Sequence, residues 1–157
     1  MRYLGGKSKH AKEIAKAIAP RGLWWDAFCG GFAMATALSE YGPGVASDAH
    51  PALISLHRAV AAGWEPPRDF SEEQHKDAQK LPDSNPLKAF AGFGCSFGGL
   101  WFHTFAKDST GKRNYASQAA NSLRRGVRGR PVEILRLDFL DVDPFPVPGL
   151  TIRTLRS

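Results

Sequence analysis

Short apolar segments alternate with helix-like segments in this chain, and the alternation is the feature that most constrains its fold. Segments with strand character are 22–28, 44–48, 132–139 and 150–154. Apolar residues at helical spacing predict helices over 9–19, 32–42 and 50–63. Strand–helix–strand–helix order predicts an α/β fold with a parallel, doubly wound sheet. Residues 64–130 differ in character and are expected to be an insertion into that sheet.

Two strand ends carry residues that suit a ligand. The first strand runs into a turn with Gly30 and Gly31, where the missing side chains let a ligand approach the backbone. The second strand ends at Asp48, whose carboxylate suits ribose hydroxyls. In open α/β sheets ligands bind at the carboxyl ends of the strands, so this pair indicates an adenosine-containing cofactor. The glycine pattern typical of dinucleotide sites is absent, and NAD fits poorly.

The charge of the chain points to a polyanion. The formal net charge is +6, and the stretch from Lys107 to Arg136 holds eight Lys or Arg residues against two acids. Such an excess suggests nucleic acid as partner, and a solvated surface segment is the alternative. Composition also argues against other classes. No apolar run is long enough for a membrane span, and Cys29 and Cys95 lack the spacing of metal ligands, which favours a reduced cytosolic setting.

Five motifs in order carry a specific resemblance. They are RYLGGK (2–7), DAFCGG (26–31), SDAHPALISLHRAV (47–60), GFGCSFGGLWF (92–102) and DFLD (138–141). Together they resemble the Dam-like DNA adenine N6-methyltransferases of bacteria and phages. The resemblance implies a Rossmann-like methyltransferase fold, S-adenosylmethionine as cofactor, double-stranded DNA as partner and methylation of a flipped adenine. It also implies the cytoplasm of a bacterium or of a phage-infected host, with no metal and no membrane.

The resemblance assigns cofactor-binding roles over residues 1–63 and 131–157. The residues are Tyr3, Lys7, Asp26, Phe28, Gly30, Asp48, Asp138 and Phe139. Alternatives stay open at three of them. Lys7 is otherwise a solvated lysine, Asp48 a helix cap and Phe139 a core residue. Ala27 stands where the family more often has Pro, a departure that loosens the turn.

Residues 64–130 correspond to the inserted target-recognition segment of the family. Most aromatic residues between 90 and 105 are expected to pack in the core. The residues expected to contact DNA are Lys112, Arg113, Asn114, Tyr115, Arg124 and Arg125. Phosphate contacts from these residues would give affinity and position rather than sequence specificity.

The catalytic Asp-Pro-Pro-Tyr motif of the family is missing after the strand at 150–154, so no catalytic residue is assigned. Asp143-Pro144-Phe145-Pro146 has similar residue types, but it precedes the strand and spaces the aromatic residue wrongly. The tail 153–157 can be encoded CGG ACC CTC CGT TCN, which encodes Asp-Pro-Pro-Phe when read from its third base. We therefore expect a slipped reading frame near Ile152, a sheet incomplete at its C-terminal end and a chain inactive by itself.

Two other classes of function stay open for this chain. It is alternatively a non-catalytic phage protein that binds nucleic acid or inhibits a host defence enzyme. It is alternatively one half of a split methyltransferase, completed by a second polypeptide. Whether this chain is itself an enzyme stays undecided by its sequence.

Overall fold

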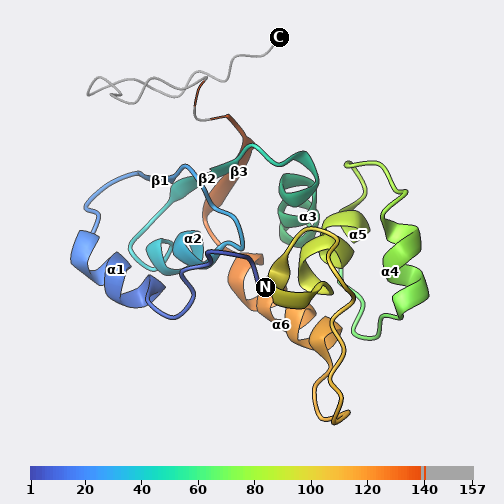
Figure 1. The fold of residues 1–157 in the computed structure, drawn as a ribbon. Coiled ribbons are helices and arrows are strands. Elements are labelled where there is room, and N and C mark those ends of the chain that lie inside the picture. The colour runs from blue at the N-terminus through green and yellow to red at the C-terminus, as the bar shows by residue number, and fades with distance from the viewer. Residues whose placement is uncertain (139, 141–157) are drawn as a thin grey trace.

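Three parallel strands form the sheet in the computed structural model, which describes residues 1–138 and residue 140 (Figure 1). They are β1 (Trp24–Asp26), β2 (Gly44–Asp48) and β3 (Val132–Arg136), in the order β1-β2-β3. The register pairs Trp24 with Gly44 and Ala46 with Ile134. The α/β prediction is confirmed. The strand expected at 150–154 lies outside the described residues. A doubly wound sheet also requires a reversal of strand order, which the three described strands do not show.

The three helices expected before the insertion are confirmed, each within the predicted range: α1 (Ala11–Ile18), α2 (Ala33–Leu38) and α3 (Pro51–Ala61). α1 ends at Ile18, and the next residue, Ala19, adopts a left-handed conformation just before Pro20. α3 begins with Pro51 in its first turn, and His50 caps it by accepting the Leu53 N–H. α2 packs on β1 and β2, and α3 packs on β2 and β3.

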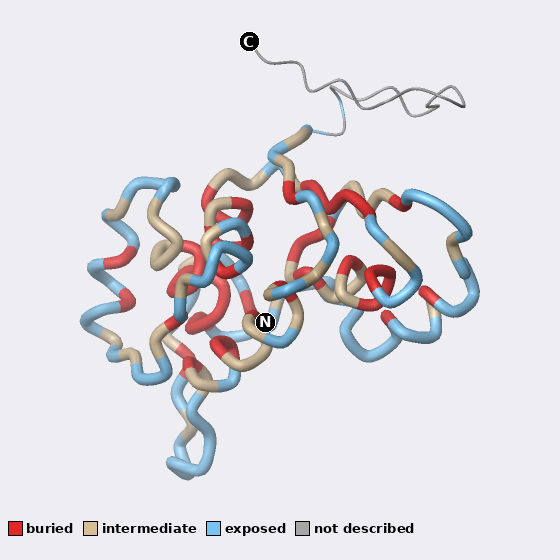
Figure 2. The backbone as a smooth tube through the Cα atoms, turned by 180° about the vertical axis from the view of Figure 1, so that it is seen from behind, coloured by how far each residue is buried: buried red, intermediate tan, exposed pale blue. Residues whose placement is uncertain are grey.

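The inserted residues are largely helical. They form α4 (Glu72–Ala78), α5 (Pro86–Ala89), a π-helical turn η1 (Phe90–Gly94), a 3₁₀ turn η2 (Phe97–Gly99) and α6 (Tyr115–Val127). Phe90 and Leu123 from this segment are fully buried in the same hydrophobic cluster as Leu53 and Ala46. The insertion and the sheet therefore share one core (Figure 2).

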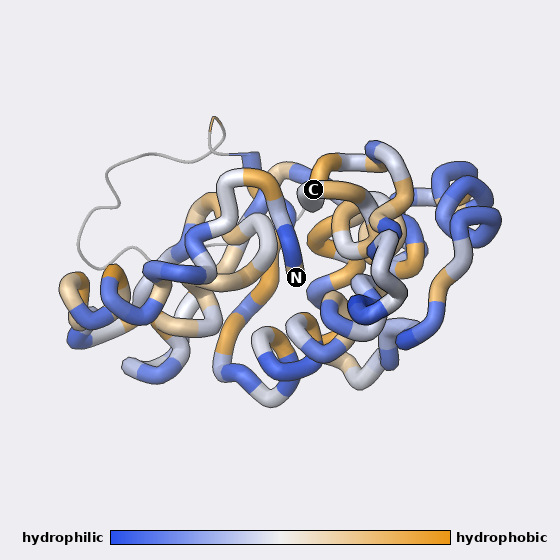
Figure 3. Tube along the Cα trace, turned by 60° about the horizontal axis from the view of Figure 1, so that its bottom comes forward, coloured by the Kyte–Doolittle hydropathy of each residue, from blue (hydrophilic) through white to orange (hydrophobic). Residues whose placement is uncertain are grey.

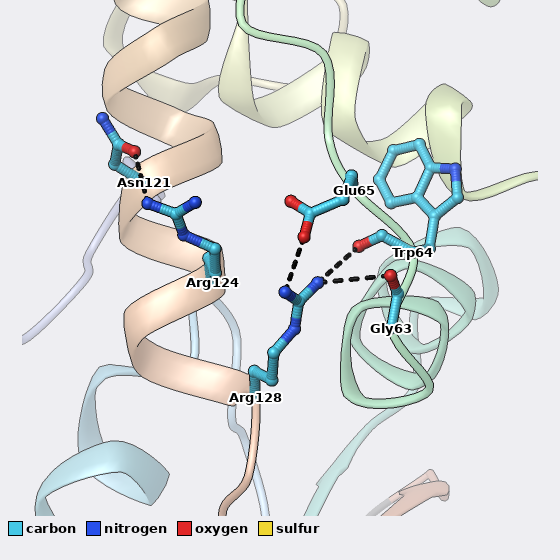
Figure 4. A network of polar contacts seen from close by, with 6 residues as sticks. All are labelled: Gly63, Trp64, Glu65, Asn121, Arg124 and Arg128. Atoms are coloured by element: carbon cyan, nitrogen blue, oxygen red, sulfur yellow. Dashed lines mark hydrogen bonds and ion pairs between the residues drawn. The ribbon is translucent and has the colours of Figure 1, made fainter.

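Arg128, directly after α6, ties the insertion to the end of α3 (Figure 4). Its Nη2 donates to the carbonyl oxygens of Gly63 (3.3 Å) and Trp64 (3.2 Å), and its Nη1 pairs with Glu65 (2.6 Å). A guanidinium can serve several acceptors at once because its donors form a rigid planar fork. This contact fixes where α6 lies before the chain enters β3.

The first residues of the chain run between two parts of the molecule. In Figures 1 and 3 the N-terminal end lies between the sheet with α1 and α2 on one side and the inserted helices on the other. Close backbone contacts agree with this placement. A Cβ on Gly99, which has a φ of +71°, would lie 2.8 Å from the Tyr3 nitrogen, so only glycine fits there.

Candidate functional site

The carboxyl ends of all three strands meet at one edge of the sheet, because the strands are parallel. Asp26 is the last residue of β1, and Asp48 is the last residue of β2. The Leu137 N–H donates to the Asp48 carbonyl oxygen (3.2 Å), which places Asp138 just beyond the end of β3. The edge therefore brings together three of the acids that the sequence assigned to cofactor binding.

Asp48 organises the Gly-rich turn that follows β1. Its Oδ2 accepts the Gly30 N–H at 3.0 Å, and its Oδ1 accepts the His50 N–H at 3.0 Å. The carboxylate thus joins the turn to the start of α3, while His50 itself caps the helix. Each carboxylate oxygen has two acceptor positions, so Asp48 retains capacity for a further donor such as a hydroxyl.

Tyr3 covers the same turn. Gly30 has a φ of +43°, and a Cβ placed on it would lie 2.9 Å from the Tyr3 ring. Any side chain at this position would therefore displace the ring as well as strain the backbone. Burial raises the pKa of the Tyr3 hydroxyl, and the negative charge of Asp48 raises it further. The tyrosine, the glycine and the aspartate form one constellation.

Aromatic rings extend from Tyr3 as a wall beside the strand ends. The centre of the Phe93 ring lies 4.9 Å from the centre of the Tyr3 ring and 4.7 Å from the centre of the Trp101 ring. His50 contacts both Phe93 (5.2 Å) and Trp101 (4.5 Å). Phe93 is buried and Trp101 is partly exposed, so the wall has an inner packed layer and an outer accessible one. An accessible aromatic surface beside an acceptor suits a purine ring.

Asp26 is a half-buried carboxylate with one unused oxygen. Its Oδ2 has no hydrogen-bond partner among the described residues. Burial raises the pKa of this carboxyl, while backbone N–H groups of Phe28 and Ala35 and the charge of Lys7 act in the opposite direction. A buried unpaired carboxylate is costly unless a donor or cation reaches it. Because this oxygen is itself buried, the structure does not present it to a ligand.

Three of the remaining predicted cofactor residues are exposed. Lys7 is exposed, although its charge is felt at Asp26. Phe28 is exposed on the turn, with 66% of its surface accessible. Asp138 is exposed and its Oδ1 accepts the Leu140 N–H at 3.1 Å. Phe139 lies outside the described residues.

His57, in α3, holds the Gly-rich turn in place, although the sequence did not predict this role. The side chain is fully buried in α3, and its Nε2 lies 2.7 Å from the Gly30 carbonyl oxygen. Burial lowers the pKa of His57 to about 4, so the neutral ring donates from Nε2. Gly30 is thus held at its N–H by Asp48 and at its carbonyl by His57. The signal was available, because His57 falls on the apolar face of a predicted helix with Leu53 and Val60.

The six residues predicted to contact DNA lie on the loop 107–114 and on α6. Lys112, Arg113 and Asn114 belong to the loop 107–114, which projects from the body of the protein (Figures 1 and 2). The Asn114 side chain caps α6 by accepting the Ser117 N–H (2.8 Å) and donates to Asp69 (3.0 Å). That side chain therefore has a structural role in this position.

The other three predicted DNA residues belong to α6. The Arg2 guanidinium lies 4.4 Å from the centre of the Tyr115 ring. Arg124 donates to Asn121 (3.3 Å) on the side of α6 that faces Glu65 (Figure 4). Arg125, although adjacent in sequence, lines a cavity between α1, α2 and α6. Neighbouring helical residues differ by about 100° in direction, which explains why the two arginines serve different surfaces.

Comparison with known proteins adds no assignment. No family model matches the chain, and no curated protein matches it. Within residues 1–138, no helix is long and apolar enough to cross a membrane. The same residues contain no group of three or more His, Cys, Asp or Glu side chains that could hold a metal ion, and Cys29 and Cys95 are buried free thiols.

Proposed function

We propose that this chain is the S-adenosylmethionine-binding and DNA-binding portion of a Dam-like DNA adenine N6-methyltransferase. One observation carries the proposal. The carboxylate at the end of β2 binds the backbone of the Gly-rich turn after β1, and an N-terminal tyrosine covers that turn. An acid and a close-approach turn at adjacent parallel strand ends are the elements that hold an adenosine group. The order of the five sequence motifs supports the same assignment.

The residues present suit the parts of this cofactor. Asp48 accepts hydrogen bonds from ribose hydroxyls on its remaining lone pairs. The wall of Tyr3, Phe93 and Trp101 offers aromatic surface for the adenine. The exposed Lys7 pairs with the carboxylate group of the cofactor. When bound, S-adenosylmethionine supplies an activated methyl group.

Methyl transfer also requires groups that orient the target adenine. An acceptor must bind the exocyclic amine, and an aromatic ring must stack on the flipped base. The sequence contains no Asp-Pro-Pro-Tyr, and the Asp143–Pro146 segment lies outside the described residues. We therefore assign binding of cofactor and DNA to this chain, and no catalytic residue.

Calorimetry with S-adenosylmethionine tests the proposal. The parent chain is expected to bind the cofactor without DNA. Asp48→Asn leaves one acceptor oxygen for the two backbone N–H groups of Gly30 and His50, and it removes the charge and an acceptor for ribose. Losing a buried hydrogen bond to a charged group costs about 1–3 kcal/mol, which corresponds to roughly 5- to 150-fold weaker binding.

Asp77→Asn is the matched control, because Asp77 is an exposed acid on α4 that pairs with Lys80. Its affinity for S-adenosylmethionine should equal that of the parent. Thermal unfolding without ligand shows whether each variant is folded. Equal binding by folded Asp48→Asn, or no binding by the parent chain, would sink the proposed pocket.

A further inference from the structure

A cavity of about 660 Å³ lies between α1, α2 and α6, apart from the strand-end constellation. Its walls include small residues, which leave room for a ligand, among them Ala11, Gly31, Ala33, Ala37, Ala119 and Gly126. The N-terminal residues separate it from the proposed cofactor site. The Tyr3 ring faces Gly30, while the neighbouring Arg2 lines the cavity. A volume of this size is typical of ligand-binding clefts.

The charges lining this cavity are strongly unbalanced. Four cations line it, Arg2, Lys12, Arg125 and Arg130, against the single carboxylate of Glu40, all among the described residues. Arg130 is bound to neutral acceptors, the carbonyl oxygens of Thr36 and Arg125 and the Ser39 hydroxyl. Its charge is therefore not neutralised by an acid.

The other three cations are available to a ligand. Within residues 1–138, the side chains of Arg2, Lys12 and Arg125 form no ion pair, and all three residues are exposed. Arg2 is held in place by its stacking on Tyr115. A guanidinium positioned on an aromatic ring keeps its donor edge free for an anion. Polar groups of Ser8, Gln118 and Ser122 also line the cavity.

The arrangement of these cations distinguishes between anions. They come from three separate segments, the N-terminal residues, α1 and α6, and each is an exposed residue rather than a buried one. Separated cations at an open cavity suit successive phosphates along a strand better than a single enclosed small anion. The net charge of +6 and the basic stretch from Lys107 to Arg136 favour a long polyanion as partner.

We propose that this cavity is where the phosphodiester backbone of double-stranded DNA binds, with Arg2, Lys12 and Arg125 as the phosphate-binding groups. The proposal rests on the proposed function only in its choice of DNA as the polyanion. It also separates Arg125 from Arg124, which the sequence grouped together. Contacts of this type position the duplex and contribute affinity without reading its sequence.

A matched pair of double variants tests the site. Lys12→Ala with Arg125→Ala removes two cavity cations. Lys16→Ala with Arg21→Ala likewise removes one lysine and one arginine, both exposed and without an ion pair among the described residues, at positions that do not line the cavity. Fluorescence anisotropy measures binding to a labelled DNA duplex at several salt concentrations. Each variant removes two positive charges, so the effect of net charge on DNA binding is the same in both.

The cavity variant is expected to flatten the plot of log affinity against log salt by about two units, one for each phosphate that the protein no longer neutralises. The control variant should lie close to the parent. Equal slopes for the two folded variants overturn the assignment. They overturn it even where the parent chain binds inorganic phosphate, because the cavity variant then keeps its affinity for the duplex.

The same variants separate this proposal from the cofactor proposal. Neither replaces Tyr3, Gly30 or Asp48, so calorimetric binding of S-adenosylmethionine should be unchanged in both. A parent chain that binds duplex DNA with the expected difference between variants, yet binds no S-adenosylmethionine, overturns the proposed function and upholds the cavity assignment. Binding of S-adenosylmethionine together with equal slopes overturns the cavity assignment alone.

Discussion

The purified 157-residue chain is expected to transfer no detectable methyl group from labelled S-adenosylmethionine to adenine-containing duplex DNA, while still binding both. Removing one hydrogen-bonding group that acts in a transition state typically costs about 10²–10³ in rate. The 157 residues contain no Asp-Pro-Pro-Tyr, the motif that on the proposed function supplies both the acceptor for the adenine amine and the stacking aromatic ring. The combined loss should therefore exceed that range. Scintillation counting of the recovered DNA measures the transfer.

The positive control is an intact Dam-like adenine methyltransferase assayed in parallel on the same duplex DNA. Its rate should exceed that of this chain by at least about 10³-fold. The parent must be prepared from cells without an adenine methyltransferase of their own. N6-methyladenine produced by the parent, and abolished by Asp143→Asn, would show that the Asp143–Pro146 segment is the catalytic motif.

Acidification is expected to destabilise the chain through His57. Its pKa in the folded protein is about 4, below the ordinary value of 6.5. The unfolded chain therefore takes up the proton first, and stability is lost as the pH falls from about 6.5 toward 4. Above a pH of about 6.5 the neutral side chain carries no such penalty. The gap between the two pKa values corresponds to about 3 kcal/mol of unfolding free energy.

Urea unfolding followed by circular dichroism between about pH 7 and pH 4 measures this loss. His57→Gln keeps a side-chain donor near the Gly30 carbonyl but cannot titrate. It should be less stable than the parent near neutral pH and show a shallower loss of stability on acidification. His103→Gln, at an exposed position, is the control and should follow the parent profile. Parallel profiles for His57→Gln and the parent would show that another group causes the acid sensitivity.

The sequence predicted the elements of the sheet well because their signals are local. Apolar spacing located α1, α2 and α3, and β2 was predicted at its observed bounds. Strand polarity then placed Asp26 and Asp48 at one edge, since parallel strands end together. β1 and β3 are shorter than predicted, at Trp24–Asp26 and Val132–Arg136. Residues 22–28 and 132–139 keep apolar character beyond the paired positions, and composition does not show where hydrogen bonding stops.

The sequence did not predict the contacts between residues that lie far apart in the chain. The Tyr3 ring reaches Gly30, and Arg2 reaches Tyr115, only because the N-terminal segment runs between the sheet and the inserted helices. The division of Arg124 from Arg125 depends on how α6 is rotated against α2 and α3. That rotation is set by packing of the buried face of α6, including Ala119 and Leu123. The number of charged residues in a segment does not show which face of a helix each of them occupies.

The central claim is that S-adenosylmethionine binds at the carboxyl ends of β1 and β2. Mapping of amide chemical shifts in the ¹⁵N-labelled chain during a titration with S-adenosylmethionine tests it most directly. The claim predicts the largest changes at Tyr3, Gly30 and Asp48, where the backbone and carboxylate interactions of the turn are concentrated. The amide chemical shifts of Ser122 and Gly126, which line the cavity at α6, should not change. Saturating S-adenosylmethionine that leaves Gly30 and Asp48 unchanged, or that shifts only the α6 amides, would contradict it.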